Sequence, residues 1–280
     1  MIKTALALGT FDGVHLGHRA VIEAAVKSGF KPIAVVFKFP PKMHFDKNVG
    51  CLTTLKDKDA QIRNLGIEQI HYLDFPDIKD MSAIEFLEHL RDQLNPAYIC
   101  CGFNYHFGKN AAGNTAMLKE FCEQNGITLK VLDPICVDEQ IISSTYVRSL
   151  LRDGLVEEAN KLLADNFGFC AEVIKGDERG RTLGFPTANQ QYPDELIDVK
   201  HGVYKSLVTV NGKTYNAITN IGHRPTFKTE QVGSETYILD FYGDIYGVPT
   251  DVRLIKFLRE EQKFDSIEQL KDAIKKDIEK

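Results

Sequence analysis

The chain has 280 residues, of which 43% are hydrophobic and 26% charged, and its formal net charge is −5. This length accommodates two domains or one large one, with cores that need no metal or disulfide for support. The acidic balance argues against a general nucleic-acid-binding protein, which usually has a basic surplus. Nucleotide substrates stay open, because they need only a few donors. No apolar run has the length that spans a membrane.

The chain starts with a lysine and a short apolar stretch up to residue 8. A signal peptide would continue into a small-residue cleavage site, whereas here Phe11 and Asp12 follow at once. We interpret the stretch as a first β-strand and expect a cytoplasmic protein. The six cysteines are scattered and include no CxxC pair, so we expect buried thiols rather than disulfides or zinc ligands.

Residues 1–163 alternate short β-type runs with helical patterns. Strands are predicted at 4–8, 32–37, 70–75, 98–101 and 127–132, and helices at 18–27, 83–94 and 115–123. The second of these helices is preceded by a capping box, Ser82-Ala83-Ile84-Glu85. This alternation predicts a Rossmann-like α/β domain, with a parallel sheet covered on both faces and ligands beyond the carboxyl ends of its strands.

Residues 164–280 have a different rhythm. Strands are predicted at 169–174, 203–210, 213–220 and 235–241, with glycine-bearing turns between them. Asn211-Gly212 between two β-type runs is the strongest short hairpin signal. We expect an antiparallel barrel or sandwich that ends in an amphipathic helix at 266–279. The predicted domain boundary therefore lies between residues 163 and 164.

A glycine-rich run, Gly9-Thr10-Phe11-Asp12-Gly13-Val14-His15-Leu16-Gly17-His18, follows the first strand. Its glycines allow a ligand to approach the main chain, and the helix that begins there is a natural anion site. His15 and His18 can both turn toward one phosphate chain and stabilise a departing pyrophosphate. The alternative is a pair of ordinary surface histidines near a turn.

A second run, Ile142-Ser143-Ser144-Thr145-Tyr146-Val147-Arg148, opens a later helix. Hydroxyl groups at a helix N-terminus, with an arginine one turn further on, suit a triphosphate. Taken alone, the hydroxyl residues indicate no more than a helix cap.

A third run, Gly176-Asp177-Glu178-Arg179-Gly180-Arg181-Thr182-Leu183-Gly184-Phe185-Pro186-Thr187-Ala188-Asn189, has no counterpart among Walker-type loops. Its glycines suit a loop that folds over phosphates. Thr187 and Asn189 offer two oxygen ligands on one side, and Mg²⁺ prefers oxygen ligands together with phosphates.

The first two runs resemble the HxGH and ISSTxxR signatures of the adenylyl/cytidylyltransferase superfamily. Residues 102–108 resemble the G-(D/N)-F-x-F-G loop of FMN adenylyltransferases, which implies a nucleotide contact for Asn104. The resemblance implies nucleotide-binding roles for Gly9, Phe11, Asp12, Gly13, Ser143, Ser144, Thr145 and Arg148. In this superfamily a substrate phosphate attacks the α-phosphate of a nucleoside triphosphate, and positioning and charge stabilisation carry the chemistry.

Residues 180–189 resemble the GRxLGFPTAN signature of riboflavin kinases, and residues 202–204, 220–227 and 235–241 resemble later motifs of that family in the same order. The resemblance places Glu235 at the catalytic base, which would accept the proton of the ribityl 5′-hydroxyl. It implies nucleotide contacts for Gly176, Arg181, Gly184 and Pro186, Mg²⁺ ligands at Thr187 and Asn189, and flavin contacts for Gly202, Tyr204, Arg259 and Phe264.

Together the two halves resemble the bacterial bifunctional riboflavin kinase/FMN adenylyltransferase family over essentially the whole chain. The resemblance implies a nucleotidyltransferase-type domain followed by a small β-barrel with a terminal helix. It implies riboflavin, FMN and ATP as substrates, FMN and FAD as products, and Mg²⁺ in both steps. We expect no nucleic-acid or membrane partner, and the sequence leaves a homo-oligomer open.

One departure from the family concerns residues 37–41. The family usually has F-(E/D)-P-H-P after its second strand, and this chain has Phe37-Lys38-Phe39-Pro40-Pro41. An acid has become a lysine and a histidine has become a proline. The loss of one charge-assisted contact would cost about 1.5–3 kcal/mol, which slows adenylyl transfer without abolishing it. The alternatives are a riboflavin kinase with weak or lost adenylyltransferase activity, and a non-catalytic flavin-responsive regulator.

Overall fold

The computed structural model describes residues 2–176, 185–223, 232–262, 264 and 266–279. The chain forms two compact units. The first comprises Met1–Cys51, Leu55–Tyr146 and Leu162–Ala164, and the second comprises Leu52–Thr54, Val147–Lys161 and Asp165–Lys280. The units interleave in sequence between residues 147 and 164, so the boundary between residues 163 and 164 stays a prediction.

A parallel sheet forms the centre of the first unit, with the strand order β3-β2-β1-β4-β5. Its strands are β1 (Thr4–Leu8), β2 (Lys31–Phe37), β3 (Gln69–Leu73), β4 (Pro96–Gly102) and β5 (Thr128–Leu132). The five predicted strands are confirmed, with small shifts at their ends. The largest shift is at β3, which stops at Leu73 because Phe75 opens the short helix α3 (Phe75–Ile78), where Pro76 has the fixed φ of a first helical turn.

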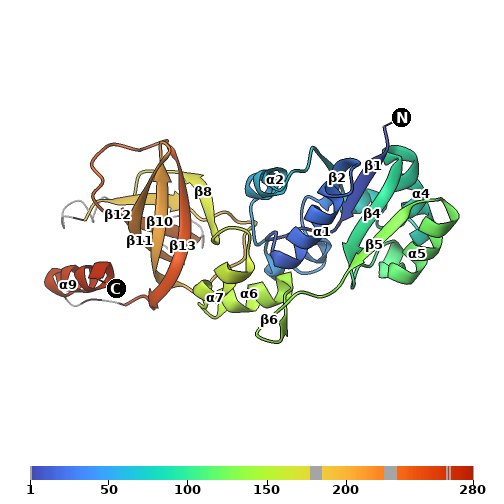
Figure 1. The fold of residues 1–280 in the computed structure, drawn as a ribbon. Helices are drawn as coiled ribbons and strands as arrows, with labels where there is room; N and C mark the ends of the chain where they lie inside the picture. The colour runs from blue at the N-terminus through green and yellow to red at the C-terminus, as the bar shows by residue number, and fades with distance from the viewer. Residues whose placement is uncertain (1, 177–184, 224–231, 263, 265, 280) are drawn as a thin grey trace. The chain divides into compact units, whose positions relative to one another are not determined.

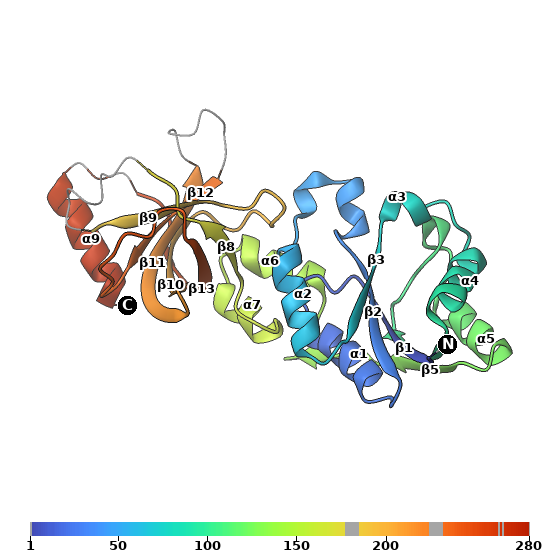
Figure 2. The ribbon, with the colours of Figure 1, turned by 90° about the horizontal axis from the view of Figure 1, so that it is seen from above.

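Helices cover both faces of this sheet, as predicted, and Figure 2 shows α1 and α2 on one side and α4 and α5 on the other. These helices are α1 (Leu16–Val26), α2 (Leu55–Asn64), α4 (Ala83–Leu94) and α5 (Thr115–Gln124). Ile22 and Ile62 are core residues on the first side, and Phe86 and Leu118 are core residues on the second. The predicted capping box before α4 is confirmed, because Ser82 and Glu85 bond to each other's main-chain N–H.

The strand order reverses at β1, from which β2 and β3 lie on one side and β4 and β5 on the other. All five residues of β1 are buried. Ligands of such sheets bind where the order reverses, outside the carboxyl ends of the strands. The loops that follow β1 and β4 are therefore placed together at the site that the fold favours.

Shorter elements complete the connections. They are the 3₁₀ helices η1 (Pro41–His44), η2 (Lys47–Val49) and η3 (Lys109–Ala111), the β6 (Cys136–Val137) and β7 (Gln140–Ile141) hairpin, and the helices α6 (Ser144–Arg152) and α7 (Val156–Leu162). Of these, α7 is tied to the second unit, because Asn160 Nδ2 donates to Leu254 O at 2.8 Å.

An antiparallel sheet forms the second unit, with the strand order β8-β13-β10-β11-β12-β9. Its strands are β8 (Gly168–Glu172), β9 (Thr187–Gln191), β10 (Gly202–Val210), β11 (Lys213–His223), β12 (Val232–Ile238) and β13 (Pro249–Arg259). The two edges approach each other, because Ile174 N, just past β8, donates to Asn189 O at 2.8 Å. The buried Gln190 of β9 also donates to Ala171 O at 2.7 Å. The sheet is therefore a nearly closed barrel, which confirms the predicted architecture.

In the second unit, the predicted hairpin is confirmed where the turn residues determine the main-chain conformation. Asn211 and Gly212 both have positive φ, at 49° and 78°, and join β10 to β11 as a two-residue hairpin. Strand β12 lies three residues earlier than predicted and ends at Ile238, because Asp240 has a left-handed φ of 53°. The terminal helix α9 (Ile267–Glu279) is present, beside the barrel in Figure 1. Across the described ranges no helix combines the length and the hydropathy of a membrane span.

Four of the six cysteines are buried, and all six are free thiols. Burial raises the pKa of the Cys100 and Cys101 thiols from 9.0 to about 12. The buried-thiol prediction is thus confirmed at Cys51, Cys100, Cys101 and Cys122, whereas Cys136 is exposed and Cys170 is partly exposed.

These thiols predict a loss of stability at alkaline pH. A thiol ionises near pH 9.0 in the unfolded chain and stays protonated in the fold up to about pH 12, so the folded state binds more protons between those values. The free energy of unfolding of the first unit then falls with pH, by up to about 1.4 kcal/mol per pH unit for each thiol. Urea titrations at pH 8.5 and 10.5 should show a smaller fall in a Cys100→Ala/Cys101→Ala variant, with the exposed Cys136→Ala as control. An equal fall in all three proteins would contradict the assignment.

Candidate active sites

The loop between β1 and α1 is folded into the core of the first unit. Phe11, Gly13 and Val14 have positive φ values of 49°, 83° and 39°, and both Phe11 and Val14 are fully buried. A Cβ on Gly9 would lie 2.9 Å from the Phe11 ring, so Gly9 has room for hydrogen only. These constraints hold the predicted phosphate loop in one conformation beside the start of α1.

His15 and His18 lie together at the N-terminus of α1. Their rings stack, with centroids 3.6 Å apart and an angle of 18° between the planes. His15 is the N-cap residue, and its Nδ1 accepts from His18 N at 3.3 Å. The helix starts two residues earlier than predicted because His15 caps it. Two imidazoles are therefore held at a helix N-terminus, where anions are stabilised.

The second predicted motif meets this loop. Ser144 Oγ donates to the main-chain oxygen of the buried Asp12 at 3.0 Å, across 132 positions of sequence. Ser143 Oγ accepts from Tyr146 N at 3.2 Å and so caps α6, while Thr145 is exposed on its first turn. Arg148, one turn further on, is buried in the part of α6 that belongs to the second unit. Its contact with a nucleotide stays a prediction.

Asn104 lies in the loop after β4, the strand next to β1. Its side chain is exposed, and its main-chain oxygen is 2.9 Å from His106 Nδ1. The loops that carry His15 and Asn104 thus follow neighbouring parallel strands and share one edge of the sheet. The nucleotide contact of Asn104 stays a prediction.

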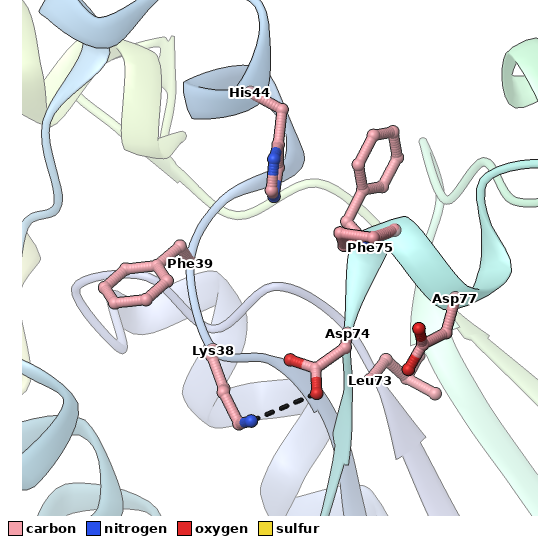
Figure 3. A pocket seen from close by; sticks show the side chains of 8 residues that line it. Lys38, Phe39, His44, Leu73, Asp74, Phe75 and Asp77 are labelled. Atoms are coloured by element: carbon pink, nitrogen blue, oxygen red, sulfur yellow. Dashed lines mark hydrogen bonds and ion pairs between the residues drawn. The ribbon is translucent and has the colours of Figure 1, made fainter.

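A pocket of about 470 Å³ lies at the carboxyl ends of β2 and β3 (Figure 3). It is lined by Lys38, Phe39, His44, Leu73, Asp74, Phe75, Pro76 and Asp77. Lys38 Nζ is 3.1 Å from Asp74 Oδ2, and the His44 and Phe75 rings are tilted at 31° with centroids 4.9 Å apart. The pocket therefore combines aromatic faces with a charged rim, and its volume lies within the roughly 300–1,000 Å³ of small-molecule sites.

The unusual residues 37–41 form one wall of this pocket. Lys38, which stands where the family usually has an acid, pairs with Asp74, the residue directly after β3. Pro41 begins η1, which ends at His44 and so brings an imidazole to the pocket from the same loop. The loop that lacks the expected histidine at position 40 thus still presents one, four residues later.

Sequence reasoning missed Lys58. It lies on α2, and only 2% of it is exposed. Its ammonium donates to Phe37 O at 2.7 Å and to Lys38 O at 2.8 Å. Burial lowers the pKa of Lys58, and the negative charge of Asp12 opposes that shift. The available signal was the position of Lys58 one turn before the core residue Ile62, on the same face of the helix.

In the second unit, three predicted residues share one face of neighbouring strands. Asn189 of β9 pairs directly with Glu235 of β12, and Thr187 lies two residues before Asn189 on the same face. Asn189 is buried, and its Nδ2 donates to Thr187 O at 3.3 Å. The register therefore brings together the predicted metal ligands and the predicted base, whose chemical roles stay predictions.

Gly176 packs against this group. A Cβ at position 176 would lie 2.5 Å from Asn189 Cγ and 2.7 Å from Asn189 Oδ1. Pro186 leads into β9, and the Phe185 ring contacts Tyr237 edge to face with centroids 5.3 Å apart. Arg181 and Gly184, two predicted nucleotide contacts, lie outside the residues that the structure describes.

Gly202 and Tyr204, which we predicted to contact flavin, lie at the start of β10 and pack against other residues of the second unit. Gly202 has a φ of 149°, and a Cβ there would lie 2.4 Å from Arg259 O. Tyr204 is buried, its hydroxyl donates to Lys200 O, and its ring packs edge to face on Phe257. Burial raises the pKa of Tyr204 above its usual range. Their contact with flavin stays a prediction.

Arg259, at the end of β13, is tied to the terminal helix. Its guanidinium lies 2.9 Å from the buried Asp277 Oδ2 of α9 and also donates through Nε at 3.0 Å. The Phe264 ring is 5.6 Å from the guanidinium carbon. Arg259 and Phe264 thus lie in contact, and Asp277 pairs with the arginine. Their contact with flavin stays a prediction.

Asn220 was part of a predicted motif, although no role was predicted for it. It pairs with Glu235 across β11 and β12, and its Nδ2 donates to Glu261 Oε1 at 2.8 Å. Asn189, Glu235 and Asn220 therefore form one row across three strands. The described ranges contain no group of three or more His, Cys, Asp or Glu side chains that could hold a metal ion.

Comparisons with known proteins agree with the division of the chain into two units. A family model described as FAD synthetase matches residues 1–146, and one described as riboflavin kinase matches residues 163–280. Bifunctional riboflavin kinase/FMN adenylyltransferases from Listeria monocytogenes and Bacillus subtilis are each 35% identical to the chain, over 99% and 98% of it and 90% of their own length. The Escherichia coli K12 protein is 32% identical, over 97% of this chain and 90% of its own.

A solved structure from Streptococcus pneumoniae, described as a macrolide-efflux protein, has the same fold. It is 30% identical to this chain, with a TM-score of 0.91 over 99% of this chain and 93% of its own.

The close contact at Gly176 predicts a stability effect. Gly176→Ala forces the Asn189 side chain or the main chain to move, and such overpacking costs about 1–3 kcal/mol. Thermal unfolding should show a lower melting temperature for the second unit. Gly243→Ala is the matched control, because its Cβ would meet only the tip of the Phe241 ring, at 3.2 Å. A Gly176→Ala protein as stable as this control would show that the packing at Asn189 is looser than described.

Proposed function

The chain belongs to the bifunctional riboflavin kinase/FMN adenylyltransferase family, and we propose which of its residues carry out the two reactions. It phosphorylates riboflavin to FMN with ATP, and it transfers the adenylyl group of ATP to FMN, which gives FAD and pyrophosphate. The observation that carries the proposal is that each matching family model falls on a separate group of candidate residues. We assign adenylyl transfer to the first unit and the kinase to the second.

In the first unit, a phosphate oxygen of FMN attacks the α-phosphorus of ATP, and pyrophosphate leaves. The reaction needs no protein nucleophile, so the residues act by positioning and by charge stabilisation. His15 and His18 stabilise the departing pyrophosphate, supported by their stacked placement at the N-terminus of α1. Ser143, Ser144 and Thr145 bind the phosphates from the start of α6, supported by the bond of Ser144 to Asp12.

The pocket at Lys38 and Phe75 is our candidate for the flavin ring of FMN in this step. Phe39, His44 and Phe75 offer faces on which a planar aromatic ring can stack. We propose that His44 supplies the imidazole that the family pattern places at position 40, and that the pair of Lys38 with Asp74 accommodates the reversed charge. An active adenylyltransferase is therefore favoured over a degenerate one, and over a regulator without catalysis.

In the second unit, the ribityl 5′-hydroxyl attacks the γ-phosphorus of ATP, and ADP leaves. We propose that Glu235 accepts the hydroxyl proton, supported by its place in the row between Asn189 and Asn220. Asn220, oriented by Glu261, contacts the substrate beside that base. Arg259 and Phe264 contact the flavin, with Asp277 holding the arginine.

Magnesium is the expected metal of both steps. At the kinase site the Thr187 hydroxyl and the Asn189 amide oxygen would hold it, supported by their shared face on β9. Two neutral oxygens bind Mg²⁺ weakly alone, so ATP phosphate oxygens must complete the ligand set. When bound, the ion neutralises phosphate charge. We also propose a cytoplasmic location. The net charge of −5 supports the absence of a nucleic-acid partner.

The proposal is tested by product analysis. Purified protein is incubated with FMN, ATP and Mg²⁺, and the flavins are separated by chromatography. FAD is the expected product. No FAD, with FMN still formed from riboflavin, would leave only the kinase half of the proposal.

If Glu235 is the base, Glu235→Gln lowers the kcat of FMN formation by roughly 10²-fold or more, because the amide cannot accept the proton. Steady-state kinetics with riboflavin measures this, and FAD formation from FMN checks the rest of the chain. Glu158→Gln, on an exposed position of α7, is the matched control. Near-normal FMN formation by Glu235→Gln would remove the assignment.

His15→Ala should impair FAD formation and spare FMN formation, since His15 lies in the first unit only. We expect kcat for adenylyl transfer to fall by about 10²-fold, the usual scale for losing one group that stabilises developing charge. Both products are quantified from the same preparation, with His89→Ala on α4 as control. Equal losses of both activities would mean that the two sites are not independent.

A further inference from the structure

Lys58 is a buried cation on α2, a helix whose other two cations, Lys56 and Arg63, are exposed. It is 2% exposed, while Lys56 on the same helix is exposed. An ammonium group removed from water is costly unless it is hydrogen-bonded and paired with an opposite charge. The site around Lys58 must therefore supply both.

The hydrogen bonds come from the main chain at the end of β2. Lys58 Nζ donates to Phe37 O at 2.7 Å and to Lys38 O at 2.8 Å, which uses two of its three donors. Both carbonyls lie where the chain leaves the sheet and enters the wall of the pocket. The side chains of Lys38 and Phe39 line that pocket immediately afterwards.

The opposite charge comes from the phosphate loop. Asp12 is buried. Among the groups whose charge favours the ammonium form of Lys58, Asp12 has the strongest effect. Asp12 lies three residues before His15, and its main-chain oxygen holds Ser144. The ammonium of Lys58 is thus bonded to the pocket wall and attracted by the loop that carries the catalytic histidines.

We propose that Lys58 is a positioning residue for adenylyl transfer. Its ammonium fixes the Phe37–Lys38 main chain relative to Asp12, and so holds the FMN pocket at a fixed position relative to His15 and His18. This inference rests on the proposed function. A methionine at position 58 would fill a similar volume, but it would leave both carbonyls and the Asp12 charge without this cation.

Lys58→Met is the test, read out as separate KM and kcat values for FAD formation. We expect KM for FMN to rise by about fivefold or more, since the loss of one hydrogen bond to a charged group weakens binding by roughly that factor or more. KM for ATP should rise by a smaller factor than KM for FMN, because both hydrogen bonds of Lys58 go to the FMN side of the site and only its attraction to Asp12 acts on the ATP side. FMN formation from riboflavin should stay within about twofold of the unaltered chain, since the kinase belongs to the other unit.

Lys56→Met is the matched control, because it removes a lysine from the same helix without touching either loop. It should leave both KM values unchanged. A Lys58→Met protein that folds and keeps the original KM for FMN would overturn the proposal, even if its melting temperature falls, because only the fold would then depend on Lys58.

Lys58→Arg covers the case in which Lys58→Met does not fold. It keeps the charge but spreads its donors over a planar fork, which must move the two carbonyls. A folded Lys58→Arg protein with a raised KM for FMN supports the proposal, and one with the original KM overturns it. Loss of the fold in both variants would assign Lys58 to stability alone and would also overturn it.

The unaltered chain distinguishes failure of the adenylyltransferase function from failure of the positioning role of Lys58. If it makes no FAD, the proposed adenylyltransferase function fails, and the positioning role fails with it. If it makes FAD and the Lys58 variants keep its KM for FMN, only the positioning role fails.

Discussion

The burial of strand β1 on both faces is the constraint on which the first site depends. Its five residues are enclosed by helices on either side of the sheet, so the first place where the chain can present polar groups is the loop after Leu8. That loop is itself anchored by Phe11 and Val14, which enter the core with left-handed main-chain angles. The site is thus built on a rigid part of the fold, which suits a reaction whose catalysis depends on positioning.

In the barrel, the candidate kinase site is held in place by the alternation of side chains along each strand. On β9, β11 and β12, one face carries a row of buried hydroxyl and amide groups, among them Gln190, Thr219 and Thr236, which bond to one another or to the main chain. The opposite face carries Asn189, Glu235 and Asn220 in register. Because the period of a strand is two, a single-residue slip of β12 would move Glu235 into the interior. The buried row therefore fixes the register on which the candidate kinase site depends.

Much of the fold was predictable because it is set by local signals. The parallel strands follow from short apolar runs, the start of α4 from its capping box, and the β10–β11 hairpin from Asn211-Gly212. Strand β13 was missed because charged residues such as Asp251 and Arg253 interrupt its apolar alternation, and these pair with each other at 2.7 Å.

The candidate sites were predictable only where a motif concentrates them in sequence. The sequence linked the two motifs that contain Asp12 and Ser144, but the bond between these residues and the pairing of Asn189 with Glu235 came from the structure. Lys58 and Asp277 carry no motif, and each acts through a partner distant in sequence. The position of Lys58 on the Ile62 face of α2 is a weak sequence signal for burial, and the fold is needed to find the partners of both residues.

If one chain carries out two phosphate-transfer reactions at two sites, isotope tracing from riboflavin will distinguish them. Parallel reactions with riboflavin receive ATP labelled at the γ-phosphate or at the α-phosphate. We expect γ-label to appear in FMN and to persist in FAD, and α-label to appear only in FAD. If FMN takes up γ-label and no α-label enters flavin, the first unit is not an adenylyltransferase. If α-label enters flavin without γ-label, the second unit is not the kinase.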